Sequence, residues 1–420
     1  MLKKMNKYIK ILILLLVVSL FHINIIKIKA SDFTHVYAKA AIAVDLNNES
    51  ILYCQNAEEK IGLASITKFF VATMALEKIE QEKINLEETV KISEKAASIK
   101  NITNSSGVYF NVGQEVTIQK LLELMMVYSD NGASVALSEH LYGTESNCLA
   151  KLNNYVKEKK LVNTLFINVT GLDQDNGEYN YSTAKELAIL AIDLLNISPE
   201  IVNYTNLKTV DFQGYQYPSF NLMLPEGLFY YDGIVGLKTG TTDSAGPSFL
   251  GLYEKEDKRI LTLISGAHDA SGNPNDYGRF TETKKMLDYV TTIDTKLIIP
   301  EKTSIKTNIK KGLGEVNLVT QMNIAYNDDI NCNLAYDKIE YNEEFINNNK
   351  IIKEIKPGEI VGYLFLKTED SITANYSLFV QDGYIKVPLT TSSTIYPENT
   401  FEKIIYAIPN FIINLYNNLW

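Results

Sequence analysis

The apolar positions along the chain predict several helices. Residues 62–77, GLASITKFFVATMALE, carry an apolar pattern too long for a buried strand and, after the first residue, contain no Gly or Pro, which indicates a buried helix. The pattern is also helical over 118–142, with an internal break at the sequence S-D-N, and over 146–166. A further helix, RFTETKKMLDYVTT, is expected to close this part of the chain near residue 295.

Other stretches have the residue types and turn signals of strands. Two strands joined by the turn LNNES are predicted in VYAKAAIAVDLNNESILYCQNA, just before the helix at 62–77. The run GIVGLKTG is expected to pair with FLGLYEKEDKRILTLISGA, in which EKED forms a hairpin tip, and together these strands predict an antiparallel sheet. From residue 297 to about 388, short β-rich runs separated by Asn, Asp and Gly predict a small all-β domain.

Both ends of the chain carry membrane-related patterns. Four lysines precede the apolar run ILILLLVVSLF, and the small residue Ala30 precedes Ser31. Residues 1–30 are therefore predicted to be a signal peptide, with an uncleaved anchor as the alternative. In residues 401–420 the apolar side chains fall at helical spacing among asparagines. This predicts an amphipathic helix that lies in a membrane interface without spanning it, or one packed on the second domain.

The composition is that of an exported globular protein. With 46 % hydrophobic and 21 % charged residues, the 420-residue chain is long enough for two domains. Its formal charge of -10, and the lack of a basic run after the first thirty residues, argue against a nucleic-acid partner. The three cysteines are far apart and odd in number, so no disulfide framework is expected. We expect no metal and no cofactor, because neither the cysteines nor the histidines have ligand spacing.

The start of the helix at 62–77 carries candidate chemistry. Ser65 and Lys68 are three residues apart, so on a helix the lysine amine can reach the serine hydroxyl. A serine becomes a good nucleophile when a neighbouring base removes its proton, and a lysine can do so when it is partly neutral. Burial against Phe69 and Phe70, and the positive end of the helix dipole, would lower the lysine pKa. The pair thus predicts a nucleophile with its own base.

The pattern S-x-x-K alone is a weak signal, and the chain contains a second match. Ser182 and Lys185 have the same spacing. There, however, Thr183 and Glu186 form a capping-box sequence before an amphipathic run, which favours an ordinary helix start.

Two later triplets separate the first match from the second. The first is Ser129-Asp130-Asn131, which ends the helical run LLELMMVYS. The second is Lys238-Thr239-Gly240, which follows the strand-like run GIVGL. Read alone, the first is a helix cap and the second is a strand end with a turn. The three motifs nevertheless occur in a characteristic order: S-x-x-K comes first, S-D-N follows 64 residues later, and K-T-G follows 109 residues after that. This is the ordered motif set of class A β-lactamases and penicillin-binding proteins.

Longer segments resemble one branch of those proteins. Five segments are similar to the low-molecular-mass penicillin-binding proteins that are serine-type D-alanyl-D-alanine carboxypeptidases. They are IGLASITKFFVATMALEKI, VGQEVTIQKLLELMMVYSDNGASVAL, TLFINVTGLD, FNLMLPEGLFYYDGIVGLKTGTTDSAG and RFTETKKMLDY. IKPGEIVGYL resembles a strand pair of that family's second domain, and FEKIIYAIPNFIINLYNNLW its terminal membrane helix. The resemblance spans nearly the whole mature chain.

The resemblance implies a fold and a domain organisation. The fold is α+β, with a penicillin-interactive, serine β-lactamase-like catalytic domain in which helices surround an antiparallel sheet. The expected divisions are a signal peptide over residues 1–30, this catalytic domain over 31–296, the small all-β domain over 297–390 and a C-terminal amphipathic membrane-association helix over 391–420. The polar segment 97–115 is expected to rim the cleft, with its Ser and Asn in surface turns.

The resemblance also implies a reaction. Ser65 would attack the carbonyl of the penultimate D-Ala of a peptidoglycan pentapeptide stem, with Lys68 as base, and water would hydrolyse the acyl-enzyme. Ser129 would relay a proton to the leaving amine, and Asn131 would hold the peptide amide. The same serine would be acylated by β-lactam antibiotics. Such an enzyme is exported and acts at the outer face of the cytoplasmic membrane, on the cell wall.

Further positions are implied to bind the substrate. The backbone N–H groups of Ser65 and Thr241 would form an oxyanion hole. Lys238, Thr239 and the adjoining Gly240, with Arg279, would bind the terminal carboxylate, for which an arginine fork is well suited.

Some observations limit the resemblance. Asp130 stands where the family more often has a small residue, and Thr241 where some members have His. Both could alter deacylation or β-lactam sensitivity. A Ser-His-Asp hydrolase is not indicated, because no G-x-S-x-G occurs. A catalytically silent wall-binding protein of the same fold is the alternative function, and the intact triplets argue against it.

Overall fold

The computed structural model describes residues 35–47, 49–293, 295–299, 304–311, 314–320, 324–327, 334–348, 350–368, 380–381 and 384–396. The predicted signal peptide, and residues 401–420 with the predicted amphipathic helix, lie outside the described residues. Residues 391–396, at the start of the predicted C-terminal segment, are described and are not helical, because Ile395 forms an antiparallel bridge with Ile355.

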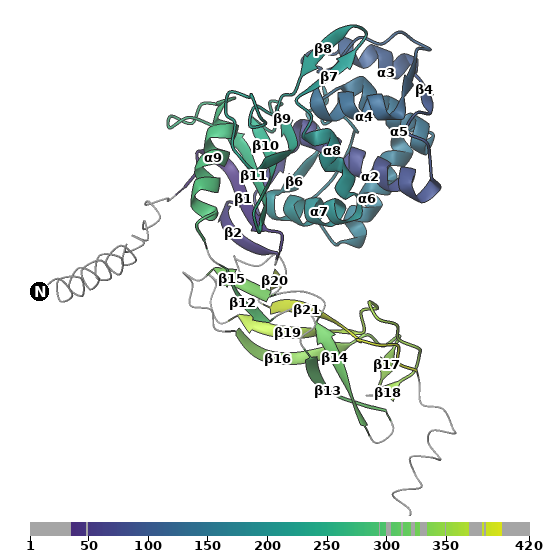
Figure 1. Ribbon diagram of the computed structural model, residues 1–420, viewed down its shortest axis with the longest axis vertical. Coiled ribbons are helices and arrows are strands. Elements are labelled where there is room, and N and C mark those ends of the chain that lie inside the picture. Colours follow the sequence, from purple (N-terminus) through teal and green to yellow (C-terminus); the bar gives the residue numbers. More distant parts are fainter. Residues whose placement is uncertain are drawn as a thin grey trace, which may run out of the picture. The chain divides into compact units, whose positions relative to one another are not determined.

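The larger part of the described chain is built on an antiparallel sheet of five strands, in the order β2-β1-β11-β10-β9 (Figure 1). Both predicted hairpins are confirmed, since β1 pairs with β2 and β10 pairs with β11. The five strands are β1 (Ala38–Asp45), β2 (Ser50–Gln55), β9 (Ile234–Gly240), β10 (Ser248–Lys255) and β11 (Lys258–Ala267).

Helices cover the two faces of this sheet (Figure 1). Helix α9 (Gly278–Val290) lies on one side. On the other is a group centred on α2 (Thr67–Glu82), which is buried from Thr67 to Leu76 and at Ile79. The rest of this group is α3 (Glu94–Ser98), α4 (Ile118–Val127), α5 (Asn131–Tyr142), α6 (Glu145–Glu158), α7 (Ala184–Ile197) and α8 (Val202–Thr205). The core beneath them is one contiguous cluster of apolar side chains.

Short elements complete this part of the chain. They are the 3-10 turns η1 (Ala64–Ile66), η2 (Ile99–Asn101) and η3 (Pro199–Ile201), and the paired strands β3 (Lys60–Gly62) with β6 (Tyr181–Thr183), β4 (Thr89–Lys91) with β5 (Glu115–Thr117), and β7 (Thr209–Phe212) with β8 (Tyr215–Pro218). In the described residues no single helix is long and apolar enough to cross a membrane, although the bent pair 184–197 and 199–205 meets the criteria of length and composition.

Two predicted helices have boundaries that differ from the structure, and a third agrees with it. The helix predicted over 62–77 begins at Thr67, after the turn η1, and continues to Glu82. The helix predicted over 146–166 ends at Glu158, and Lys160 has a left-handed φ of 59°. The helix predicted over 118–142 is two helices, with the S-D-N triplet at the break as expected.

The β-rich part of the sequence forms sheets of its own. Among the described residues, its strands pair only with one another, in an eight-stranded sheet and a two-stranded one, around an apolar cluster that includes Ile309, Leu364 and Val387. We propose that this is the small all-β domain predicted over 297–390. Its strands are β12 (Thr295–Ile299), β13 (Ser304–Lys311), β14 (Gly314–Thr320), β15 (Ile324–Asn327), β16 (Leu334–Tyr341), β17 (Ile346–Asn347), β18 (Lys350–Ile351), β19 (Gly362–Thr368), β20 (Val380–Gln381) and β21 (Tyr384–Thr390).

Candidate active site

The turn that carries Ser65 is held by close contact with two other segments. A Cβ on Gly240, at the end of β9, would lie 3.0 Å from the backbone N of Ser65. A Cβ on Gly171 would lie 1.8 Å from the carbonyl oxygen of Ala64, and Gly171 also has a left-handed φ of 83°. Only glycine fits at Gly171, so the strand end and the loop can both reach the backbone beside Ser65.

Ser65 and Lys68 form a hydrogen-bonded pair. Lys68 Nζ lies 2.9 Å from Ser65 Oγ and donates to the carbonyl oxygen of Thr170 over 2.7 Å. Lys68 is fully buried. Burial, followed by the nearby Lys238 ammonium, holds the Lys68 pKa well below its usual value, while Asp130 opposes this. A neutral amine in this position can accept the serine proton.

The S-D-N triplet forms the turn between α4 and α5. Ser129 has a left-handed φ of 59°, which is uncommon for a residue with a side chain. Asp130 is the N-cap of α5. Ser129 Oγ and Asn131 Oδ1 are buried, and neither has a hydrogen-bond partner in the described part of the chain. Buried polar atoms are nearly always paired, so these two are available to a ligand.

A cationic group lies at the end of β9. Lys238 is fully buried; burial, and to a lesser extent Arg279, lower its pKa to about 7. Arg279, on α9, donates through Nη1 to the carbonyl oxygen of Gly240 over 3.1 Å and through Nε to that of Asp276 over 2.7 Å. It also forms an ion pair with the Asp276 carboxylate.

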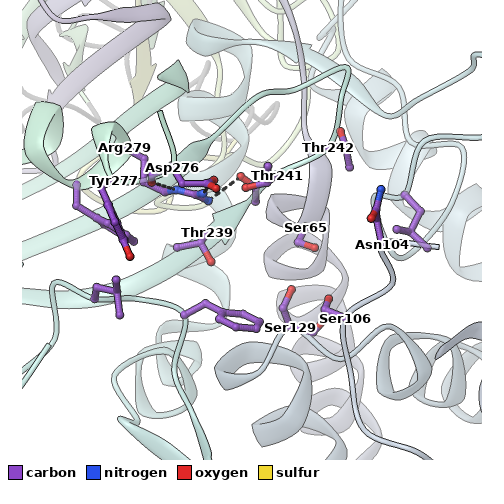
Figure 2. A pocket seen from close by; sticks show the side chains of 15 residues that line it. Ser65, Asn104, Ser106, Ser129, Thr239, Thr241, Thr242, Asp276, Tyr277 and Arg279 are labelled. Atoms are coloured by element: carbon purple, nitrogen blue, oxygen red, sulfur yellow. Dashed lines mark hydrogen bonds and ion pairs between the residues drawn. The ribbon is translucent and has the colours of Figure 1, made fainter. Parts of the chain in front are cut away.

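These groups meet at one cavity of about 320 Å³. Figure 2 shows Ser65 in the middle, with Ser129 on one side and Thr239, Thr241 and Arg279 on the other. Of the nine predicted site residues, six line the cavity: Ser65, Ser129, Thr239, Gly240, Thr241 and Arg279. The other three are buried behind its wall: Lys68, Asn131 and Lys238. The second S-x-x-K match does not contribute to it.

That second match has structural partners. Ser182 Oγ is hydrogen-bonded to Thr164 Oγ1, while Lys185 forms an ion pair with Glu58. Half of the predicted capping box is present, because Thr183 accepts from the N–H of Glu186. The Glu186 carboxylate does not return the bond; it accepts from Thr164 and from Asn163 instead.

Segment 97–115 reaches the cavity as predicted, through Asn104 and Ser106. Its serines are not simply surface turns, since Ser105 is buried and accepts from Asn131 Nδ2 over 2.8 Å. Thr170 was not identified from the sequence as a partner of Lys68, although it lies in TLFINVTGLD, one of the segments that resemble the family. In the described residues no group of three or more His, Cys, Asp or Glu side chains is placed to hold a metal ion.

The chain is similar to known D-alanyl-D-alanine carboxypeptidases and penicillin-binding proteins. The chain is 28 % identical to the D-alanyl-D-alanine carboxypeptidase DacF of Bacillus subtilis, over 86 % of this chain and 90 % of that protein. Penicillin-binding protein 3 of Streptococcus pneumoniae, a peptidoglycan synthesis regulatory factor, superposes with a TM-score of 0.63 at 26 % identity, over 85 % of this chain and 99 % of that one. The ampicillin-bound form of penicillin-binding protein D2 of Listeria monocytogenes superposes with a TM-score of 0.52 at 28 % identity, over 61 % and 98 %.

The fold and the Ser65–Lys68 pair together define a serine hydrolase with the penicillin-binding fold, so the predicted fold class is confirmed. The chain belongs to the D-alanyl-D-alanine carboxypeptidase family, peptidase family S11, whose model matches residues 27–269, more than half of the chain.

Proposed function

We propose that this enzyme removes the terminal D-alanine from peptidoglycan pentapeptide stems through an acyl-enzyme on Ser65, and that β-lactams acylate the same serine. The observation that carries this proposal is the 2.9 Å contact between Ser65 Oγ and a fully buried Lys68, at a cavity that also holds Arg279. A nucleophile, a base and a carboxylate-binding group are the parts that a serine carboxypeptidase needs.

The geometry supports a two-step reaction. Lys68 accepts the Ser65 proton while Oγ attacks the carbonyl carbon of the penultimate D-Ala, and the N–H groups of Ser65 and Thr241 bind the oxyanion. When the tetrahedral intermediate collapses, the C–N bond breaks and the leaving amine takes a proton through Ser129. Water then attacks the ester, its proton passes to the same base, and Ser65 leaves with a proton restored to it.

Substrate recognition uses the two ends of the cavity. Arg279 and Thr239 line the cavity and Lys238 is buried behind them, so together they supply positive charge and a hydroxyl for the terminal carboxylate. The unpaired Oδ1 of Asn131 is an acceptor for the peptide N–H of the penultimate residue. An uncharged C-terminus would not complement the positive charge of Arg279 and Lys238, so we expect the enzyme to select a free carboxyl end.

Benzylpenicillin is expected to add one penicilloyl group, on Ser65, because its lactam carbonyl presents the same electrophile to the same nucleophile. Mass spectrometry of the digested protein measures this directly. Ser65→Ala should fold and carry no adduct, and Lys185→Ala, in the second S-x-x-K match, should be labelled normally. A penicilloyl group on the peptide containing Ser182, or no adduct at all, would refute the assignment.

We further propose that the enzyme acts at the outer face of the cytoplasmic membrane and is held there by residues 401–420. The support is sequence alone: a signal-like N-terminus and about ten apolar side chains at helical spacing beside asparagines.

A protein lacking the signal peptide is therefore expected to sediment with liposomes, including neutral ones, since the asparagine-rich polar face contributes little electrostatic attraction. A version ending at residue 398 should remain in the supernatant and keep its rate on a short peptide, because no proposed site residue follows Arg279. Equal sedimentation of the two versions would show that the segment does not bind membranes.

A further inference from the structure

Asp130 makes contacts that its place between two site residues does not require. Its side chain is fully buried. Oδ1 accepts from the N–H of Ala133 over 2.8 Å and thereby caps α5, while Oδ2 accepts from the N–H of Val108 over 2.6 Å. One carboxylate therefore joins a helix N-terminus to a loop 22 residues earlier. A glycine or an alanine at this position could make neither bond.

Gly107 is fitted to this carboxylate. It has a φ of 137°, and a Cβ built on it would lie 2.7 Å from Asp130 Oδ2. The carboxylate thus occupies the space that any side chain at position 107 would need. Residues with a Cβ rarely adopt this backbone conformation, so the loop and Asp130 form a matched pair.

The same loop is bonded directly to the two neighbours of Asp130. Ser106 Oγ donates to the carbonyl oxygen of Ser129 over 2.7 Å, and the N–H of Asn131 donates to that of Ser106 over 3.1 Å. Asn131 Nδ2 donates to Ser105 Oγ over 2.8 Å. These bonds leave Ser129 Oγ and Asn131 Oδ1 unpaired beside the cavity, although Ser129 is in a left-handed conformation that needs external support.

We propose, building on the function proposed above, that Asp130 is a positioning residue. It holds residues 105–108 against the turn Ser129–Asn131, and so orients the side chains of Ser129 and Asn131 toward the substrate bound to Ser65. It acts through its neighbours and does not touch the reacting atoms. A displacement of about 1 Å in a catalytic group can cost on the order of 100-fold in rate.

If Asp130 acted only through its charge, removing it would change the acylation rate in the opposite direction. Asp130 is the acidic group that raises the pKa of Lys68, against the burial and the Lys238 charge that lower it. Burial raises the pKa of Asp130 itself to about 6, so that at pH 8 it is ionised and accepts through both oxygens. Removing its charge would lower the Lys68 pKa further and favour the neutral base. Acylation would then be unchanged or faster, whereas loss of positioning makes it slower.

Asp130→Asn tests this in the full-length protein. An asparagine can still cap α5 through its one acceptor oxygen, so the N–H of Val108 then faces the amide nitrogen and loses its partner. At pH 8 we expect Ser65 to be acylated by benzylpenicillin at least about tenfold more slowly. With a peptide ending in D-Ala-D-Ala, kcat should fall more than KM rises, because Ser129 acts in the transition state.

Gly107→Ala is the second variant, because it disturbs the same contact and leaves the charge of Asp130 in place. Gly113→Ala is its matched control: Gly113 lies in the same loop with a φ of 79°, but a Cβ there meets only the end of the Lys91 side chain, at 3.5 Å. We expect slow acylation in Gly107→Ala and a near-normal rate in Gly113→Ala. If acylation were slowed equally in both variants, backbone strain would explain the effect and the proposal would be overturned.

Hydrogen exchange separates this proposal from the proposed function. In Asp130→Asn, peptides covering residues 104–110 should exchange faster, because the N–H of Val108 has lost its acceptor. Acylation of Asp130→Asn within twofold of the wild-type rate, or unchanged exchange over 104–110, overturns the positioning role. If the wild type itself were not labelled at Ser65, the proposed function would be wrong. The exchange rate in Asp130→Asn would still test whether Asp130 holds residues 105–108 in place.

Discussion

Lys68→Ala is expected to lose activity as completely as Ser65→Ala, by about 10,000-fold or more in kcat/KM, and the double variant should be no worse than either. Lys68 is the partner through which Ser65 loses its proton, so the two act as one unit. The measurement is the hydrolysis of a peptide ending in D-Ala-D-Ala, together with the rate of penicillin acylation.

Lys68→Arg is the informative companion variant. A guanidinium keeps the positive charge and much of the length, but it does not give up its proton in proteins. If Lys68 is the base, Lys68→Arg is as inactive as Lys68→Ala. Recovery of activity in Lys68→Arg would mean that the charge, and not proton transfer, is what this position supplies. Lys185→Ala, in the second S-x-x-K match, should retain full activity.

The sequence predicted the local parts of this site well, because those parts depend on short-range periodicity. The three-residue spacing of Ser65 and Lys68 does bring Nζ to Oγ, and Thr183 does cap α7 as the pattern indicated. The hairpins followed from turn residues between apolar runs. Each of these features is decided by residues within a few positions of one another.

The contacts that the sequence did not predict join distant residues. Thr170 accepts from Lys68 across 102 positions, and Ser105 accepts from Asn131 across 26. No local periodicity marks such partners, and Thr170 could have been found only through the family resemblance of the segment TLFINVTGLD. The start of the Ser65 helix was placed too early for a similar reason. Ala64 has a left-handed φ of 45°, in a turn packed closely against Gly171 and Gly240.

Boundaries were least accurate where tertiary partners compete with local ones. The Glu186 carboxylate was expected to complete a capping box, but it accepts from three donors instead: the backbone N–H and the side-chain amide of Asn163, and the hydroxyl of Thr164. Residues 391–396 were assigned to a helical segment but are not helical, and Ile395 among them forms a β-bridge with Ile355. The domain division at 296 and the membrane segment at 401–420 stay predictions.

Arg279→Ala is expected to reduce kcat/KM for a peptide ending in D-Ala-D-Ala by about 100-fold, since a charge-assisted hydrogen bond to a carboxylate contributes about 1.5–3 kcal/mol. The more specific consequence is a change in selectivity. The wild type should strongly prefer the free carboxylate to the same peptide with an amidated C-terminus. The variant should discriminate much less, because the ammonium of Lys238 alone remains and its pKa is about 7.

Asp276 has to be controlled for in this experiment. Its carboxylate pairs with Arg279 at the edge of the cavity, so Arg279→Ala alone would leave an unpaired negative charge that repels the substrate carboxylate. In Arg279→Ala/Asp276→Asn that repulsion is absent. If Arg279 binds the carboxylate, the double variant still fails to distinguish the acid from the amide. If the double variant regains the wild-type preference, the loss in Arg279→Ala came from the exposed Asp276 charge, and carboxylate recognition belongs to Lys238 and Thr239.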